Sequence, residues 1–191
     1  MSYCGRTGEK NCKCFDPIKP MSAKQIDLNQ TLRKLFSDHG VYTAFVLKSI
    51  VDHQPDTKVF LTRLLANQKD IGDQLKPILG AKASALLTKV LTEHIQLAGA
   101  VITAATNKDK TLNQKIEALF RNSDEVAKVL TSVNPELLPL NVTSDMFHKH
   151  NEYVISMTQY RIAKKYKKEQ ETYDSYYNEL LMMADAIYNA I

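Results

Sequence analysis

The sequence predicts an all-α protein: an antiparallel bundle of six helices, built from three repeated helical hairpins and preceded by an irregular N-terminal arm. Only six Gly and six Pro interrupt its 191 residues, so helix-breaking residues are scarce. Apolar residues recur at i, i+3, i+4 and i+7 along most of the chain, which is helical spacing. A His–Asn pattern also returns with a period of about 55 residues, which indicates a repeat architecture.

The repeat is defined by three histidines, each followed 28 positions later by an asparagine. The pairs are His39 and Asn67, His94 and Asn122, and His150 and Asn178. Their flanking residues also resemble one another: Leu-Phe-Ser-Asp precedes His39 and Val-Leu-Thr-Glu precedes His94. We therefore expect three related units between residues 29 and 191.

The N-terminal arm is expected to span residues 1–28. Pro17 and Pro20 exclude a helix there, because proline lacks a backbone N–H and clashes with the preceding turn. The arm holds all three cysteines, Cys4, Cys12 and Cys14, and an odd number cannot form a closed set of disulfides. A reduced tail, a small metal knuckle and one disulfide beside a free thiol all remain open.

The apolar stripes and breaks place six helices at about 29–52, 56–78, 81–106, 110–132, 145–163 and 166–190. Pro55 marks the first turn, Pro77 and Gly80 the second, and residues 107–109 the third. Residues 134–141 form a proline-containing connection, after which Thr143 or Ser144 can cap the fifth helix. Without a Gly or Pro near Lys164, a single long helix over 145–190 remains an alternative.

In each expected hairpin the histidine lies about 14 residues before the turn and the asparagine about 14 after it. Antiparallel helices pair positions equidistant from their turn, so each His meets its Asn, and three hairpins form one polar layer. Such a layer is stable only when its groups are hydrogen-bonded. One interpretation is that it fixes the register of the helices, as buried polar residues do in coiled coils.

The other interpretation is a metal site for zinc or another divalent ion. Three neutral imidazoles are a known zinc ligand set with an open fourth position. Asp70 and Glu125 each follow their Asn by three residues, on the same helix face, where a carboxylate could orient an imidazole. The third repeat has Leu181 at that position.

The composition bounds the class of protein. The first 14 residues lack an apolar segment typical of a signal peptide, and the charge-free stretch at about 95–107 is too short to span a membrane. A formal net charge of +4 is mild, so nucleic-acid binding is not expected. We expect an intracellular soluble protein or a virion component.

Residues 64–72 and 86–95, with Tyr173-Asp174 and Met183-Ala184-Asp185 near the end, resemble a group of uncharacterised small helical-bundle proteins of bacteria and some large DNA viruses. The resemblance covers about residues 32–188 and implies a helical bundle in which the His–Asn pattern matters. The chain departs from the group at Lys69, usually acidic, and at Tyr177, usually His.

The predicted function is a non-enzymatic structural or protein-interaction module, with a virion component as its specific form and the arm as the segment that contacts a neighbour. The alternative is a metal-binding bundle, conceivably catalytic.

Overall fold

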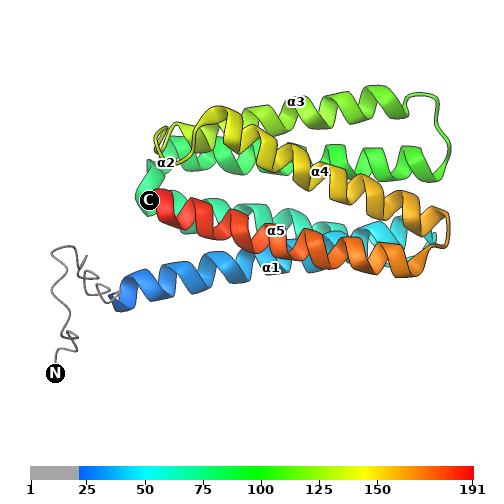
Figure 1. Ribbon diagram of the computed structural model, residues 1–191, viewed down its shortest axis with the longest axis horizontal. Helices are drawn as coiled ribbons and strands as arrows, with labels where there is room; N and C mark the ends of the chain where they lie inside the picture. Colours follow the sequence, from blue (N-terminus) through cyan, green and yellow to red (C-terminus); the bar gives the residue numbers. More distant parts are fainter. Residues whose placement is uncertain (1–21) are drawn as a thin grey trace, which may run out of the picture.

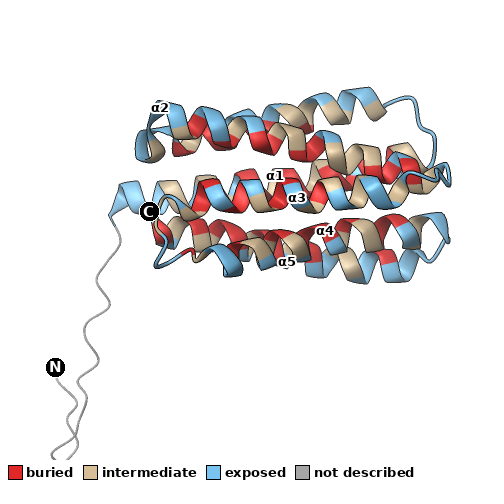
Figure 2. Cartoon of the chain, turned by 90° about the horizontal axis from the view of Figure 1, so that it is seen from above, coloured by how far each residue is buried: buried red, intermediate tan, exposed pale blue. Residues whose placement is uncertain are grey.

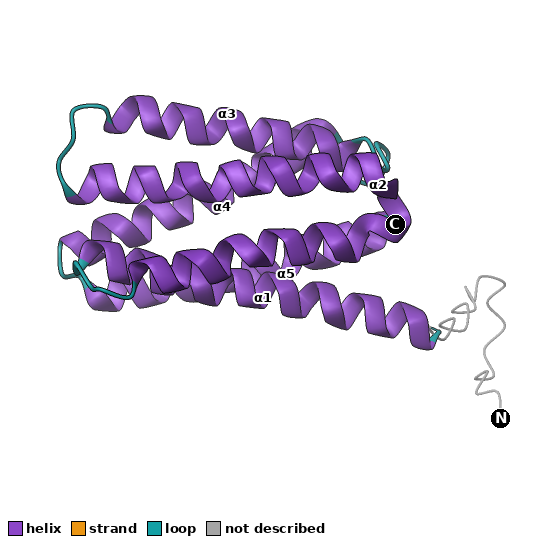
Figure 3. Cartoon of the chain, turned by 180° about the vertical axis from the view of Figure 1, so that it is seen from behind, coloured by secondary structure: helices purple, strands orange, loops and turns teal. Residues whose placement is uncertain are grey.

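The computed structural model describes residues 22–191, and all regular structure there is helical, as predicted (Figure 1). The helices are α1 (Ala23–Val51), α2 (Thr57–Thr106), α3 (Leu112–Thr131), α4 (Leu140–Ile162) and α5 (Tyr166–Ala190). The described residues therefore form five helices, and the prediction of six separate helices is not confirmed. Short connections lie at the two ends of the elongated bundle (Figure 3).

Helix α1 begins at Ala23, earlier than the predicted start at residue 29, because Ser22 caps it. The Ser22 side chain accepts a hydrogen bond from the backbone N–H of Gln25, and the Gln25 side chain accepts one from the backbone of Ser22. This reciprocal capping box satisfies two N–H groups that a helix start otherwise leaves unpaired. Residues 23–28 thus belong to α1 and not to the arm, whose cysteines lie outside the described residues.

The helices predicted at 56–78 and 81–106 are the two parts of α2, which changes direction at Gly80. We call them the first and second arms of α2, as distinct from the N-terminal arm. Gly80 has φ 78° and ψ 165°, a conformation that side-chain-bearing residues avoid. Beyond it the second arm folds back on the first, since Ser84 Oγ donates to the carbonyl of Gly72 at 2.7 Å. A Cβ on Gly72 would overlap Thr88 Oγ1, so this glycine allows the two arms to approach closely.

Three of the connections share one turn geometry, each with a non-glycine residue at positive φ: His53, Lys108 and Lys164. The residue after each donates its N–H to a carbonyl five positions earlier, at 2.8–2.9 Å: Gln54 to Ser49, Asp109 to Ala104 and Lys165 to Tyr160. This is the Schellman pattern of helix ends. The residue at positive φ lies fourteen positions after His39, His94 and His150 in the three turns. The third of these turns separates α4 from α5.

Helix α4 begins at Leu140, earlier than predicted, directly after Pro139. The φ angle of proline is fixed at a value that suits the start of a helix, so α4 extends back to the residue that follows Pro139. Thr143 is consequently inside the helix and does not cap it; its hydroxyl donates to the carbonyl of Pro139 at 3.0 Å.

Each helix packs against its neighbours in sequence, and α1 also packs against α5, which closes the bundle. Buried residues gather on the inward faces (Figure 2). The pair α1 and α5 approaches closely at Gly40, where a Cβ would lie 2.6 Å from Leu180 Cδ1, and Arg33 bonds to Asp185 at 2.5 Å near the end of α5.

Helix α2 is long and apolar enough to cross a membrane by length and composition alone. Many of its apolar side chains are buried in the bundle, among them Leu64, Ile71, Leu75, Leu87 and Ile102. The core helix of a soluble protein has the same properties.

Candidate functional site

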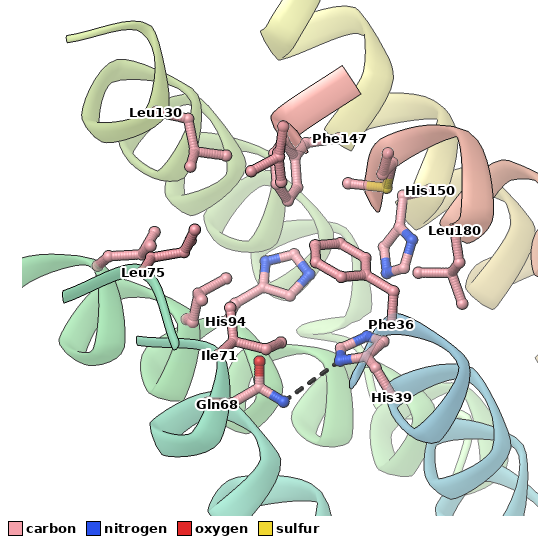
Figure 4. A pocket seen from close by; sticks show the side chains of 14 residues that line it. Phe36, His39, Gln68, Ile71, Leu75, His94, Leu130, Phe147, His150 and Leu180 are labelled. Carbon is pink, nitrogen blue, oxygen red and sulfur yellow. Dashed lines mark hydrogen bonds between the residues drawn. The ribbon is translucent and has the colours of Figure 1, made fainter. Parts of the chain in front are cut away.

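Three histidines from three helices meet in the middle of the bundle. His39 of α1, His94 of the second arm of α2 and His150 of α4 are 7%, 4% and 4% exposed. The ring centroid of His150 lies 5.5 Å from that of His39 and 6.0 Å from that of His94. Figure 4 shows the three imidazoles beside one another, surrounded by apolar side chains. The sequence period therefore points to a real cluster, which we call the histidine layer.

His94 is held by its own hairpin. Its Nδ1 lies 3.0 Å from Asn122 Oδ1, so the imidazole donates and the amide oxygen accepts. The Asn122 amide nitrogen donates in turn to the carbonyl of Val90 at 3.1 Å, one helical turn before His94. Asn122 thus bonds α3 to both the ring and the backbone of the facing helix.

His39 is held in a similar way by two adjacent amides, Asn67 and Gln68. Asn67 donates to the carbonyl of Leu35 at 3.0 Å, which matches the bond between Asn122 and Val90. Asn67 and Gln68 are both fully buried.

Counting donors fixes the direction of the bond to His39. Gln68 Nε2 lies 2.9 Å from the carbonyl of Leu64, 3.1 Å from Asn67 Oδ1 and 3.2 Å from His39 Nδ1, and Figure 4 marks the last contact. An amide nitrogen has only two hydrogens, and the two closer oxygens account for them. We therefore assign the proton of the neutral ring to His39 Nδ1, as in His94.

In the third hairpin the partner is Glu179 and not the predicted Asn178. His150 Nδ1 lies 3.3 Å from Glu179 Oε2, and Glu179 is only 4% exposed. Asn178 is exposed.

The inward stripe of α5 explains this difference. In α5 the buried residues Tyr176, Met183 and Ile187 follow His150 by 26, 33 and 37 positions. In α2 the corresponding buried residues Leu64, Ile71 and Leu75 follow His39 by 25, 32 and 36 positions, which is one fewer in each case. One residue more between the histidine and the stripe turns Asn178 away from the core and turns Glu179 into it. The buried stripe of α5 was the sequence signal for this position, whereas the repeated identity of asparagine was misleading.

The two carboxylates predicted beside the layer lie on the surface. Asp70 is exposed and pairs with Arg63 at 3.3 Å. Glu125 is exposed and pairs with Lys128 at 2.6 Å. Neither carboxylate orients an imidazole. The position three residues after each buried Asn lies outside the buried face of its helix, which continues at the next residue, Ile71 or Val126.

Other polar residues next to the layer escaped sequence reasoning. Asn151 is 1% exposed and donates to Ser123 Oγ at 2.8 Å, which joins α4 to α3. Ser123 follows Asn122 as Gln68 follows Asn67, so the position after each asparagine was the available signal.

Burial keeps two of the rings neutral. Burial is the main cause that lowers the pKa of His39 well below its usual range, and His150 and His94 lower it further, while the bond with Asn67 opposes the shift. Burial, and then His150, lower the pKa of His94 to about 3, against the bond with Asn122. Both imidazoles therefore offer a lone pair at neutral pH.

Small internal cavities lie on both sides of the layer, and all three histidines line each of them. The first, of about 30 Å³, is otherwise almost wholly apolar, with Phe36, Leu91 and Met183 in its wall. The second, of about 20 Å³, adjoins Thr43 and Asn151. Each has room for about one water molecule or an ion of similar size.

Within residues 22–191, no group of three or more His, Cys, Asp or Glu side chains is preformed to hold a metal ion as the side chains stand. Cys4, Cys12 and Cys14 lie outside that range. Chemically, the layer is a set of imidazoles, amides and one buried carboxyl group in an apolar surrounding.

No protein family, curated protein or solved structure matches this chain in sequence or fold. Its function must therefore be argued from the site.

Proposed function

We propose that the chain is a non-enzymatic structural or protein-interaction module whose histidine layer sets the register of its helices. The observation that carries the proposal is that Nδ1 of each histidine lies within hydrogen-bonding distance of a side chain on the facing helix: Gln68 for His39, Asn122 for His94 and Glu179 for His150. A helix that slides by one turn would break these bonds and leave buried polar groups unpaired, which is costly.

The same bonds support the view that the bundle consists of three related hairpins. The two arms of α2 then belong to different hairpins, α1 with the first arm and α3 with the second, and α4 pairs with α5. The recurring turns at His53, Lys108 and Lys164 support this division.

We further propose that the module works inside a cell or a virion, with the arm that precedes Ser22, residues 1–21, as the segment that contacts a neighbouring protein. The capping box at Ser22 ends the arm at a defined point, so a contact made there is transmitted to a rigid helix. Nucleic acid is not the expected partner, given the mild net charge of +4.

The register role is tested by preparing the full chain free of metal and measuring its helix content and cooperative unfolding. A fully folded metal-free protein agrees with a layer whose own hydrogen bonds are enough to hold the helices in register. A metal-free protein without cooperative unfolding would contradict the proposal.

The partner role is tested by limited proteolysis of the arm in the free protein and in assemblies isolated from the source cells. Protection of the arm in the assembly agrees with a contact there, and equal cleavage in both samples would rule it out.

A further inference from the structure

The histidine layer leaves one nitrogen of each ring without a partner. Nδ1 of His39, His94 and His150 faces Gln68, Asn122 and Glu179 respectively, and we assign the proton of each ring, when it is neutral, to Nδ1. The three Nε2 atoms then carry lone pairs, and none of them makes a hydrogen bond in the part of the chain that the structure describes. Three unpaired acceptors close together and away from solvent call for a positively charged or hydrogen-donating guest.

We propose that the layer binds one divalent metal ion of the zinc class through Nε2 of His39, His94 and His150. Three imidazoles and an open fourth position, filled by water, form a known zinc coordination set. The adjoining cavities provide room for that water.

The groups behind the rings fit this role. Histidines that bind metals usually donate their other ring nitrogen to a carboxylate or an amide or backbone oxygen, which fixes the tautomer and the ring direction. Here Asn122 and Glu179 are such acceptors for His94 and His150, and the Gln68 amide lies 3.2 Å from His39 Nδ1. The third hairpin therefore uses Glu179 where the others use an amide, and this places one carboxyl group beside the rings.

The electrostatics of the layer also favour a cation. Glu179 is buried, its Oε1 has no hydrogen-bond partner, and no lysine or arginine among the described residues pairs with it. A bound divalent ion offsets a negative charge in that position.

Binding requires a small inward movement of the rings. The ring centroids of His39 and His150 are 5.5 Å apart and those of His94 and His150 are 6.0 Å apart, which is farther than in three imidazoles that bind one ion. This agrees with the lack of a preformed metal-binding group among residues 22–191. Zinc–imidazole bonds are about 2.0–2.1 Å long. The cavities on both sides let the rings tilt while the Nδ1 bonds act as pivots.

The experiment uses the full chain with Cys4→Ser, Cys12→Ser and Cys14→Ser, because thiolates of the arm would bind the same ions. The metal-free protein is titrated with Co²⁺, followed by visible absorption, and then with Zn²⁺, followed by thermal unfolding. We expect one ion per chain, tetrahedral-type Co²⁺ bands lost on adding Zn²⁺, and a melting temperature raised by about 5–10 °C at a hundredfold excess over Kd.

His94→Gln removes one ligand and should abolish the Co²⁺ bands. The matched control is His148→Gln, because His148 is partly exposed and bonds to Asp124 outside the layer; its bands should persist. If His94→Gln fails to fold, Glu179→Gln keeps an acceptor for His150 and should still weaken binding by about 10–100-fold.

Absence of Co²⁺ bands and of any thermal shift in the cysteine-free protein would overturn the proposal and leave only water in the cavities. Bands of equal strength in His94→Gln, or unchanged affinity in Glu179→Gln, would also overturn it by placing the ion elsewhere. A metal-free protein that folds but binds no ion leaves the register role intact, so the two proposals fail separately.

Discussion

His94 and Asn122 stand twenty-eight positions apart and meet across two antiparallel helices, with His94 Nδ1 3.0 Å from Asn122 Oδ1. The same amide donates to the carbonyl of Val90, so one asparagine joins a side chain and the backbone of the facing helix. Asn67 makes the corresponding bond to Leu35 in the first hairpin. These bonds are the physical content of the sequence repeat.

Replacing Asn122 should therefore be costly. Asn122→Ala removes both bonds and leaves Nδ1 of His94 unpaired in the core, and we expect a loss of about 2–4 kcal/mol in the free energy of unfolding. Asn178→Ala is the matched control, because Asn178 is exposed, and it should change stability by less than about 0.5 kcal/mol. Urea denaturation measures both. Equal losses would mean that Asn178 shares the role of Asn122.

Stability should fall as the pH is lowered from 7 to 5. The folded protein holds the pKa values of His39 and His94 below the unfolded value near 6.5. Below about pH 6.5 the unfolded chain therefore binds protons that the folded chain does not. Each of the two histidines then lowers the free energy of unfolding by about 1.4 kcal/mol for every pH unit. By pH 5 the two groups together should lower the free energy of unfolding by about 3–4 kcal/mol.

Denaturation at pH 7, 6 and 5 checks this. His94→Gln removes one of the two groups, so its stability should fall by less over the same range. A wild-type stability that does not change between pH 7 and 5 would contradict burial of neutral histidines.

Gly72 should not tolerate a side chain. Its added Cβ would overlap Thr88 Oγ1 on the other arm of α2, so Gly72→Ala should destabilise the protein by about 1–3 kcal/mol. Gly99 lies in the same helix with nothing within 4 Å of an added Cβ, and Gly99→Ala should be neutral or stabilising by up to about 1 kcal/mol. Thr88→Ala should restore part of the loss in Gly72→Ala. Similar melting temperatures for the two alanine variants would argue against the close approach of the arms.

Glycine should improve a hairpin turn. Lys108 has φ 54°, a region that costs about 1 kcal/mol for a residue with a side chain. Lys108→Gly should therefore raise the free energy of unfolding by about 0.5–1 kcal/mol. Lys89→Gly, at an exposed position inside α2, should lower it by about 1 kcal/mol. A loss of stability in Lys108→Gly would exclude the left-handed conformation at that turn.

The sequence period predicted which positions face each histidine from the following helix, because that pairing depends only on the distance of each from the turn between them. A turn fourteen residues from His39, His94 and His150 brings a fixed position of the next helix opposite the ring. Asn67 and Asn122 follow directly from that geometry. Asn178 does not, because the stripe of α5 is displaced by one residue and presents Glu179 to the core.

The parts that sequence reasoning missed depend on contacts between hairpins or on a single capping residue. The bond between Asn151 and Ser123 joins α4 to α3, which belong to different hairpins, and no period within a hairpin predicts it. The start of α1 was set by Ser22 and Gln25, a pair with the spacing of a capping box. The start of α4 directly follows Pro139, whose ring favours the first turn of a helix, whereas the sequence predicts a rigid connection there.

The most direct test of the layer is ¹⁵N NMR of the imidazole rings in the metal-free, full-length protein. We predict that His39 and His94 carry their proton on Nδ1 at pH 7, in slow exchange with water, and that both rings stay neutral at pH 5. Exposed His53 provides a reference ring in the same spectra. Rings of His39 and His94 that gain a proton between pH 7 and 6, or that carry their proton on Nε2, would contradict the account.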